Sequence, residues 1–268
     1  MICPPSSSDM RAKKSLGQNF LMHPQTAQRI RDAAHLSKND IVLEIGPGTG
    51  MLTKPLLAVA KKVIALEADH ELVKKLHETF AFEIEHKKLE LIETDVRAFD
   101  PSSLQEPYTL VANIPYYLTG EIIRKFLSAT HKPRSMTLLV QKEVAERITR
   151  SKKESLLSIS VKIYGTPEYE FTIPRGAFIP APSVDSALIS IRDIQNPFDS
   201  EHAERHFFDA VRAGFSAKRK RLAKNLEAIA PKEVISEAFE SLSLSQNIRA
   251  EDISCDTWKK LVAALHFS

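Results

Sequence analysis

The chain has 268 residues, of which 43% are hydrophobic, 26% charged and 7% aromatic, a composition that excludes a disordered chain and allows one sizeable core plus a small second module. No apolar run is long enough to cross a bilayer, and residues 1–10 lack the apolar core of a signal peptide, so we expect a frayed tail and no membrane partner. The formal net charge of +3 does not by itself indicate nucleic-acid binding. The two cysteines, Cys3 and Cys255, are far apart in the sequence and form no metal or redox motif. This cysteine usage is typical of a protein of the reducing cytoplasm.

From about residue 41 to residue 140, short apolar runs typical of buried strands alternate with amphipathic stretches typical of helices. The expected strands cover residues 41–43, 63–66, 89–92, 110–112 and 136–140. The expected helices cover residues 51–60, 71–80 and 119–129. This alternation predicts an α/β fold with an open, mostly parallel sheet and helices on both faces.

Two later segments rich in β-branched residues, 168–173 and 186–191, flank a proline-containing loop and predict a closing β-pair. Residues 156–164 alternate like a strand, but a helix there would also connect well. After residue 194 no strand is expected, and four segments show helical spacing, at residues 201–213, 217–228, 232–241 and 252–266. The sequence therefore predicts a domain of residues 1–194 and a small all-α domain of residues 195–268.

A glycine-rich turn, Glu44-Ile-Gly-Pro-Gly-Thr-Gly50, follows the first expected strand. Glycines let the backbone turn sharply and let a ligand approach without meeting a Cβ atom. The spacing of Gly46, Gly48 and Gly50 differs from the dinucleotide pattern, and no Lys-Ser/Thr pair follows, which argues against a nucleoside-triphosphate loop. Glu67 ends the second strand, where an acid can accept hydrogen bonds from both hydroxyls of a ribose. These features predict an adenosine-containing cofactor.

Asp95 follows the third expected strand and is placed to accept a hydrogen bond from the cofactor's adenine amine. The alternative is an aspartate that caps the next turn. An anionic group of the cofactor would lie at the amino end of the helix after Gly50. Pro55 suits that helix only if the regular part begins near Lys54.

The fourth strand ends in Asn113-Ile114-Pro115-Tyr116-Tyr117. The adenine amine is a poor nucleophile, and an enzyme can help by accepting hydrogen bonds from both of its N–H groups. The side-chain oxygen of Asn113 and the carbonyl of Pro115 are suitable acceptors, and Tyr116 can stack on the purine. Such a site needs orientation toward a methyl donor rather than a strong base. An Asn-x-Pro turn with two core tyrosines is the alternative.

With these motifs the sequence resembles the small-subunit rRNA adenine N6-dimethyltransferases of the KsgA type over nearly its whole length. Residues 14–21 resemble the family's N-terminal motif, residues 141–145 its motif after the fifth strand, and residues 178–186 its F-x-P-x-P-x-V-x-S loop. The resemblance implies a Rossmann-like class I methyltransferase sheet, a helix at residues 156–164, and S-adenosyl-L-methionine as cofactor. It implies that the cofactor is bound by Gln18, Asn19, Leu21, Gly46, Gly48, Glu67, Asp95 and Asn113. It also implies that Phe178, otherwise as easily a core residue, covers the second face of the target base.

The same resemblance implies dimethylation of two adjacent adenosines near the 3′ end of 16S rRNA, in the small ribosomal subunit or its assembly intermediate. Two departures from the family pattern occur. Leu118-Thr119-Gly120-Glu121 replaces the usual Ser/Thr-Ser/Thr-Pro, which puts the loop's rigidity in doubt, and Ala181 stands where proline is frequent.

Extrusion of a target base costs a few kcal/mol, which Tyr116 and Phe178 would partly recover by stacking. We expect phosphate contacts from Lys218 and Arg221, which share a face with Asn225 if residues 217–228 are helical, although a solvated helix face is the alternative. Further basic contacts are expected from Arg11, Lys13 and Lys14. The histidines show no ligand spacing, so no metal is expected, and one RNA cleft per chain is consistent with a monomer.

Three other functions compete with this interpretation. A large-subunit rRNA adenine methyltransferase of the macrolide-resistance type shares the Asn-x-Pro-Tyr site, but residues 14–21 and the substantial helical domain favour the small subunit. A methyltransferase-like assembly factor with little catalysis is disfavoured by the intact Gly46, Glu67, Asn113 and Tyr116. A nicotinamide dehydrogenase is disfavoured by the glycine spacing.

Overall fold

The computed structural model describes residues 17–265 and divides the chain into two compact units. The first unit runs to Ala145 and resumes at Glu168–Ile194, and the second holds Glu146–Pro167 together with the chain from Gln195 onward. Our sequence-based division at residue 195 stays a prediction. The compact units differ from it by assigning residues 146–167 to the second unit.

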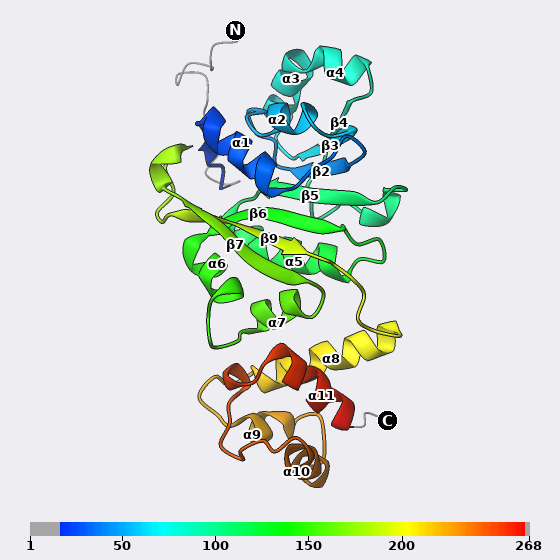
Figure 1. Ribbon diagram of the computed structural model, residues 1–268, viewed down its shortest axis with the longest axis vertical. Coiled ribbons are helices and arrows are strands. Elements are labelled where there is room, and N and C mark those ends of the chain that lie inside the picture. The colour runs from blue at the N-terminus through cyan, green and yellow to red at the C-terminus, as the bar shows by residue number, and fades with distance from the viewer. Residues whose placement is uncertain (1–16, 266–268) are drawn as a thin grey trace. The chain divides into compact units, whose positions relative to one another are not determined.

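A seven-stranded sheet forms the first unit, with the strand order β4-β3-β2-β5-β6-β9-β7. The strands are β2 (Ile41–Ile45), β3 (Lys62–Glu67), β4 (Leu89–Glu93), β5 (Tyr108–Asn113), β6 (Ser135–Gln141), β7 (Thr166–Ile173) and β9 (Ser186–Arg192). The first five are parallel neighbours, and β9 pairs antiparallel with β6, Ser186 opposite Gln141. The expected parallel sheet and its closing pair are therefore confirmed (Figure 1).

The helices of the first unit follow the strands in βαβ fashion. They are α1 (Pro24–Ala33), α2 (Thr53–Leu57), α3 (His70–Thr79), α4 (Ala81–Glu85), α5 (Thr119–Ser128) and α6 (Lys142–Thr149), the last of which continues into the second unit. Helix α1 was not predicted, although Pro24 at its first turn and the buried Ala27, Ile30 and Ala33 give it a start signal and an apolar stripe. Pro55 lies in the first turn of α2, where its missing N–H costs little.

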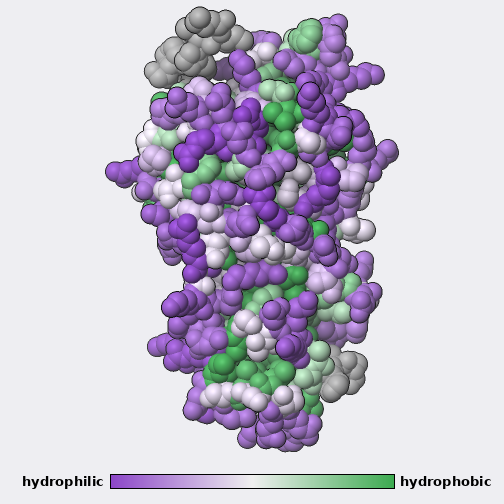
Figure 2. All heavy atoms as spheres, viewed as in Figure 1, coloured by the Kyte–Doolittle hydropathy of each residue, from purple (hydrophilic) through white to green (hydrophobic). Residues whose placement is uncertain are grey.

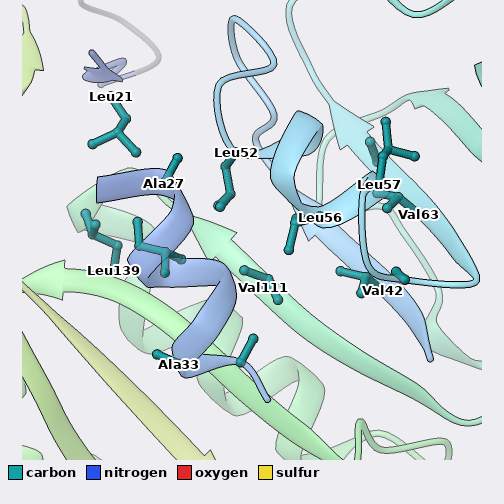
Figure 3. Close-up of a cluster of buried hydrophobic side chains, with 14 of the residues drawn as sticks. Leu21, Ala27, Ala33, Val42, Leu52, Leu56, Leu57, Val63, Val111 and Leu139 are labelled. Carbon is teal, nitrogen blue, oxygen red and sulfur yellow. The ribbon is translucent and has the colours of Figure 1, made fainter. Parts of the chain in front are cut away.

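One apolar cluster joins α1 and α2 to the sheet (Figure 3). Val42 and Val111 from two strands belong to it together with Ala27 of α1 and Leu56 of α2. Successive strand residues point to opposite faces, so Leu43, next to Val42 on β2, faces the other side of the sheet together with Ile41 and Ile45. The buried apolar side chains of α5 do not belong to the cluster, and we assign them to that second face.

The second unit is helical. Its helices are α7 (Leu156–Lys162), α8 (Glu201–Gly214), α9 (Leu222–Leu226), α10 (Lys232–Ser241) and α11 (Cys255–Ala264). The fully buried Trp258 of α11 lies so close to α8 that a Cβ atom on Gly214 would come within 2.4 Å of its ring, which explains the glycine. The helix implied by the family at residues 156–164 is confirmed as α7, which begins with a Ser155–Ser158 capping box.

One expected helix is largely wrong. Of residues 217–228 only Leu222–Leu226 form a helix, and residues 215–221 form an irregular turn. The cause is Asn225, whose buried side-chain amide donates to the carbonyls of Gly214 at 2.6 Å and Ala217 at 3.2 Å. These bonds satisfy the carbonyl of the last residue of α8 and one carbonyl of the turn that follows, so Asn225 does not share an exposed helical face with Lys218.

Hydrophilic residues dominate the face drawn in Figure 2, with apolar residues in smaller patches between them. None of the helices within residues 17–265 has the length and apolar character needed to span a bilayer.

Candidate active site

A pocket of the first unit lies at the carboxyl ends of β2, β3, β4 and β5, the edge where open α/β sheets bind ligands. Its floor is the glycine turn, in which Gly46, Gly48 and Gly50 have positive φ angles of 69°, 58° and 80°. A Cβ atom on Gly48 would lie 3.1 Å from the ring of Phe20, and one on Gly50 would lie 2.5 Å from the ring of Phe80. Only glycine fits both the backbone conformation and the space at these positions.

Glu67 ends β3 beside this turn, and its side chain is 6% exposed. One carboxylate oxygen accepts the N–H of Gly48 at 3.1 Å, and the other accepts the N–H of Asp69 at 2.9 Å. Burial raises the pKa of this carboxyl, and the backbone hydrogen bonds oppose the rise. A carboxylate has about four acceptor sites, so Glu67 keeps capacity for two hydroxyl donors.

Asp95 lines the same pocket, and the capping alternative is also observed. Its Oδ1 accepts the backbone N–H of Arg97 at 2.8 Å, which forms the turn after β4. The Arg97 guanidinium also binds the carboxylate and holds the pKa of Asp95 below its usual value.

The N-terminal motif reaches the pocket from its other side. Gln18, Asn19 and Leu21 all line it, and the Gln18 amide donates to the Asp69 carboxylate at 3.0 Å. The Asn113 amide nitrogen donates to the backbone carbonyl of Asn19 at 3.3 Å. This bond orients the amide, because it leaves Oδ1 of Asn113 as the atom that can accept a hydrogen bond from a ligand.

Pro115 and Tyr116 follow Asn113 and also line the pocket. The Pro115 carbonyl accepts the N–H of Leu118 at 3.0 Å, so this expected acceptor already serves the turn. Ile114 lines the pocket as well and offers a second backbone carbonyl in the same loop.

Ser186 is a site residue whose role the sequence did not reveal. Its hydroxyl lies 2.6 Å from the Tyr116 hydroxyl, and it is fully buried at the start of β9. Burial raises the pKa of the Tyr116 phenol, so the hydroxyl stays neutral and hydrogen-bonded. The bond fixes the position of the hydroxyl end of the ring.

Phe178 lies apart from this arrangement. It is 2% exposed, pairs with Leu21 across the short antiparallel strands β1 (Phe20–Leu21) and β8 (Phe178–Ile179), and belongs to the apolar cluster. It does not line the pocket. In this conformation the ring of Phe178 is packed in the core, and its expected contact with a target base stays a prediction.

The predicted RNA-binding residues are only partly described. Arg11, Lys13 and Lys14 lie outside the described residues. Lys218 and Arg221 are exposed in the turn before α9, where Arg221 donates to the Asn247 side chain at 3.4 Å. They are available to a polyanion, but from a turn rather than from a helix.

A family model described as ribosomal RNA adenine dimethylase matches residues 9–266. The ribosomal RNA small subunit methyltransferase A of Dehalococcoides mccartyi is 40% identical over 261 residues, which cover 94% of this chain and 88% of that protein. The protein of the same name from Fusobacterium nucleatum is 36% identical, with 95% of this chain and 97% of that protein covered.

Two solved structures share the fold at 27% identity. They are a dimethyladenosine transferase from Plasmodium falciparum, with a TM-score of 0.78 over 90% of this chain and 95% of that one, and the 23S rRNA methyltransferase ErmE, with a TM-score of 0.75 over 92% of this chain and 99% of that one. The expected class I methyltransferase fold is thereby confirmed. Since the family model spans nearly the whole length, the chain belongs to the ribosomal RNA adenine dimethylase family of enzymes.

Proposed function

We propose that the chain transfers methyl groups from S-adenosyl-L-methionine to the N6 amines of two adjacent adenosines near the 3′ end of 16S rRNA, during assembly of the small subunit. The observation that carries this proposal is the orientation of Asn113. The Asn113 amide nitrogen donates to the Asn19 carbonyl, which leaves the Asn113 side-chain oxygen as an acceptor for a ligand. Asn113 lines the pocket together with Glu67 and the glycine turn.

The pocket's residues fit S-adenosyl-L-methionine, which supplies a methyl group on a positively charged sulfur when bound. Glu67 would hold the two ribose hydroxyls with its remaining acceptor sites. Asp95 would accept from the adenine amine. The turn at Gly46 and Gly48 lines the pocket and would lie against the ligand, in a backbone conformation of positive φ that glycine allows.

The chain's own residues then position the substrate amine. Oδ1 of Asn113 accepts one N–H, and the Pro115 carbonyl, which keeps a second lone pair beside its bond to Leu118, or the neighbouring Ile114 carbonyl accepts the other. Tyr116, held by Ser186, stacks on the purine. Positioning of this kind can contribute about 7–11 kcal/mol to catalysis in favourable systems.

The comparison with relatives supports the small subunit as substrate. The relatives at 36–40% identity are named as small-subunit methyltransferases, whereas ErmE, a 23S rRNA methyltransferase, is 27% identical. Arg11, Lys13, Lys14, Lys218 and Arg221 would contact RNA phosphates. We infer that the protein acts in the cytoplasm. We also infer that it acts as a monomer.

The test is transfer of labelled methyl groups to unmodified small and large subunits, followed by nucleoside analysis. We expect N6,N6-dimethyladenosine in the small-subunit RNA, and a loss of at least about a hundredfold in the rate for Asn113→Ala, the usual effect of removing one group aligned with the reacting atoms. Label in the large subunit would establish the macrolide-resistance type of activity. No transfer by a protein that still binds immature small subunits would establish an assembly factor.

A further inference from the structure

Most of the acceptor capacity of the Asp95 carboxylate is used by one residue, Arg97. Oδ1 accepts the Arg97 backbone N–H at 2.8 Å, Oδ2 accepts Nη2–H at 2.5 Å, and the single Nε–H is shared between the two oxygens at 3.0 Å each. Three donors of one residue thus surround a carboxylate that offers about four lone-pair sites. An adenine amine at this carboxylate therefore competes with the Arg97 guanidinium.

The side-chain contacts are the ones that can break. The backbone bond belongs to the turn, and Lys125 holds that turn by donating to the Arg97 carbonyl at 2.7 Å. The guanidinium, in contrast, is 55% exposed and lines the pocket. An exposed ion pair is weak, so a ligand donor of good geometry can displace it.

We propose that Arg97 is a latch on the cofactor pocket: its guanidinium competes with the adenine amine of S-adenosyl-L-methionine for Asp95, and cofactor binding releases it to bind an RNA phosphate. This inference rests on the proposed function. Among residues 17–265, Asp95 is the only carboxylate within ion-pair distance of Arg97. Release therefore leaves the guanidinium without a carboxylate in contact, near Glu121 of α5 and beside the pocket, where a backbone phosphate can bind it. The cofactor then strengthens RNA binding, and RNA strengthens cofactor binding by the same factor.

The first measurement is cofactor affinity without RNA, by calorimetry, on the wild type and Arg97→Gln. Removing the competitor should tighten cofactor binding about two- to fivefold, the range set by an exposed ion pair. Arg124→Gln, which removes an exposed cation from α5 outside the pocket, is the matched control for long-range charge and should not tighten it. Unchanged or weaker binding by Arg97→Gln, or equal tightening by Arg124→Gln, overturns the latch.

The second measurement is binding of a fragment of small-subunit RNA with and without S-adenosylhomocysteine, which has the same adenosine but no methyl group to transfer. The wild type should bind RNA more tightly with this ligand, and Arg97→Gln should lose that gain while Arg124→Gln keeps it. An equal gain in wild type and Arg97→Gln also overturns the latch. Failure of the wild type to bind either ligand would instead overturn the proposed function.

Discussion

Replacing Glu44 by glutamine tests the protonation of a carboxyl buried beneath the glycine turn. Glu44 is 1% exposed, and neither of its carboxyl oxygens has a hydrogen-bond partner among residues 17–265. Burial raises the pKa of this carboxyl from 4.5 to about 8, and the charge of Glu67 adds to the rise. The nearby Thr53 side chain acts to lower the pKa of Glu44, although its hydroxyl is outside hydrogen-bonding geometry. Glu44 is therefore a neutral acid in the folded protein at pH 7.

The sign of the pH dependence follows from proton binding. Between pH 4.5 and about pH 8 the folded state holds a proton on Glu44 that the unfolded state has released. The free energy of unfolding therefore falls as the pH rises through this interval, by up to about 1.4 kcal/mol per unit and about 5 kcal/mol in all. The contribution of Glu44 is fully present below pH 4.5 and lost above about pH 8.

Glutamine has nearly the same shape and no proton to lose, so Glu44→Gln should match the wild type near pH 4.5 and exceed it in stability near pH 8. The measurement is urea unfolding at constant ionic strength at several pH values, with the difference between the two proteins plotted against pH. Glu85→Gln removes an exposed carboxyl from α4 and supplies the comparison for a surface site. Parallel curves for wild type and Glu44→Gln from pH 5 to pH 8 would refute the reasoning.

Three further substitutions follow from single contacts. Ser186→Ala removes the anchor of Tyr116 and should lower the single-turnover methylation rate more than cofactor affinity, with Ser186→Thr restoring the rate; equal losses in both would point to a merely structural role. Gly50→Ala forces a Cβ atom to within 2.5 Å of the Phe80 ring at a φ of 80°, and should lower the free energy of unfolding in urea by at least about 1–3 kcal/mol. The control is Gly120→Ala, whose Cβ atom would have nothing within 4 Å and which should raise the free energy of unfolding by about 0.5–1 kcal/mol. Asn225→Ala leaves the Gly214 carbonyl at the end of α8 without its side-chain donor, whereas the Ala217 carbonyl keeps the N–H of Lys220 at 3.0 Å, and should cost about 1–3 kcal/mol by thermal unfolding; an unchanged melting temperature would show that the turn is stable without this side chain.

Local patterns predicted the sheet because each strand is indicated by a short apolar run of a few residues. The runs at residues 41–43 and 63–66 became β2 and β3, and the structure only extends them by one or two residues at their ends. The glycine turn could also be predicted, since its conformation depends on residues within the motif. The pocket then follows from topology, because parallel strands bring Glu67, Asp95 and Asn113 to one edge of the sheet.

Residues 215–221 show where such patterns fail. Their composition suits a helix, and the apolar spacing continues into Leu222–Leu226. A side chain ten residues from Phe215, that of Asn225, instead satisfies the carbonyls that a continuous helix would use. Helix propensity is worth only a few tenths of a kcal/mol per residue, so one buried amide outweighs it.

The partners of Phe178 and Arg97 could not be predicted from the sequence for a related reason: each side chain has two possible partners, and the sequence does not say which is taken. The contact of Phe178 with a target base stays a prediction, and for Arg97 the sequence predicted no role. Phe178 can cover a base or fill the core between β1 and the sheet, and in this conformation it fills the core. Arg97 can bind Asp95 or a phosphate, and without a ligand it binds Asp95. Both alternatives differ by energies of the size that ligand binding supplies. A side chain that binds another part of the protein and could also bind a ligand is therefore a position where the ligand competes with a contact of the fold, and such competition is where coupling between cofactor and RNA can arise.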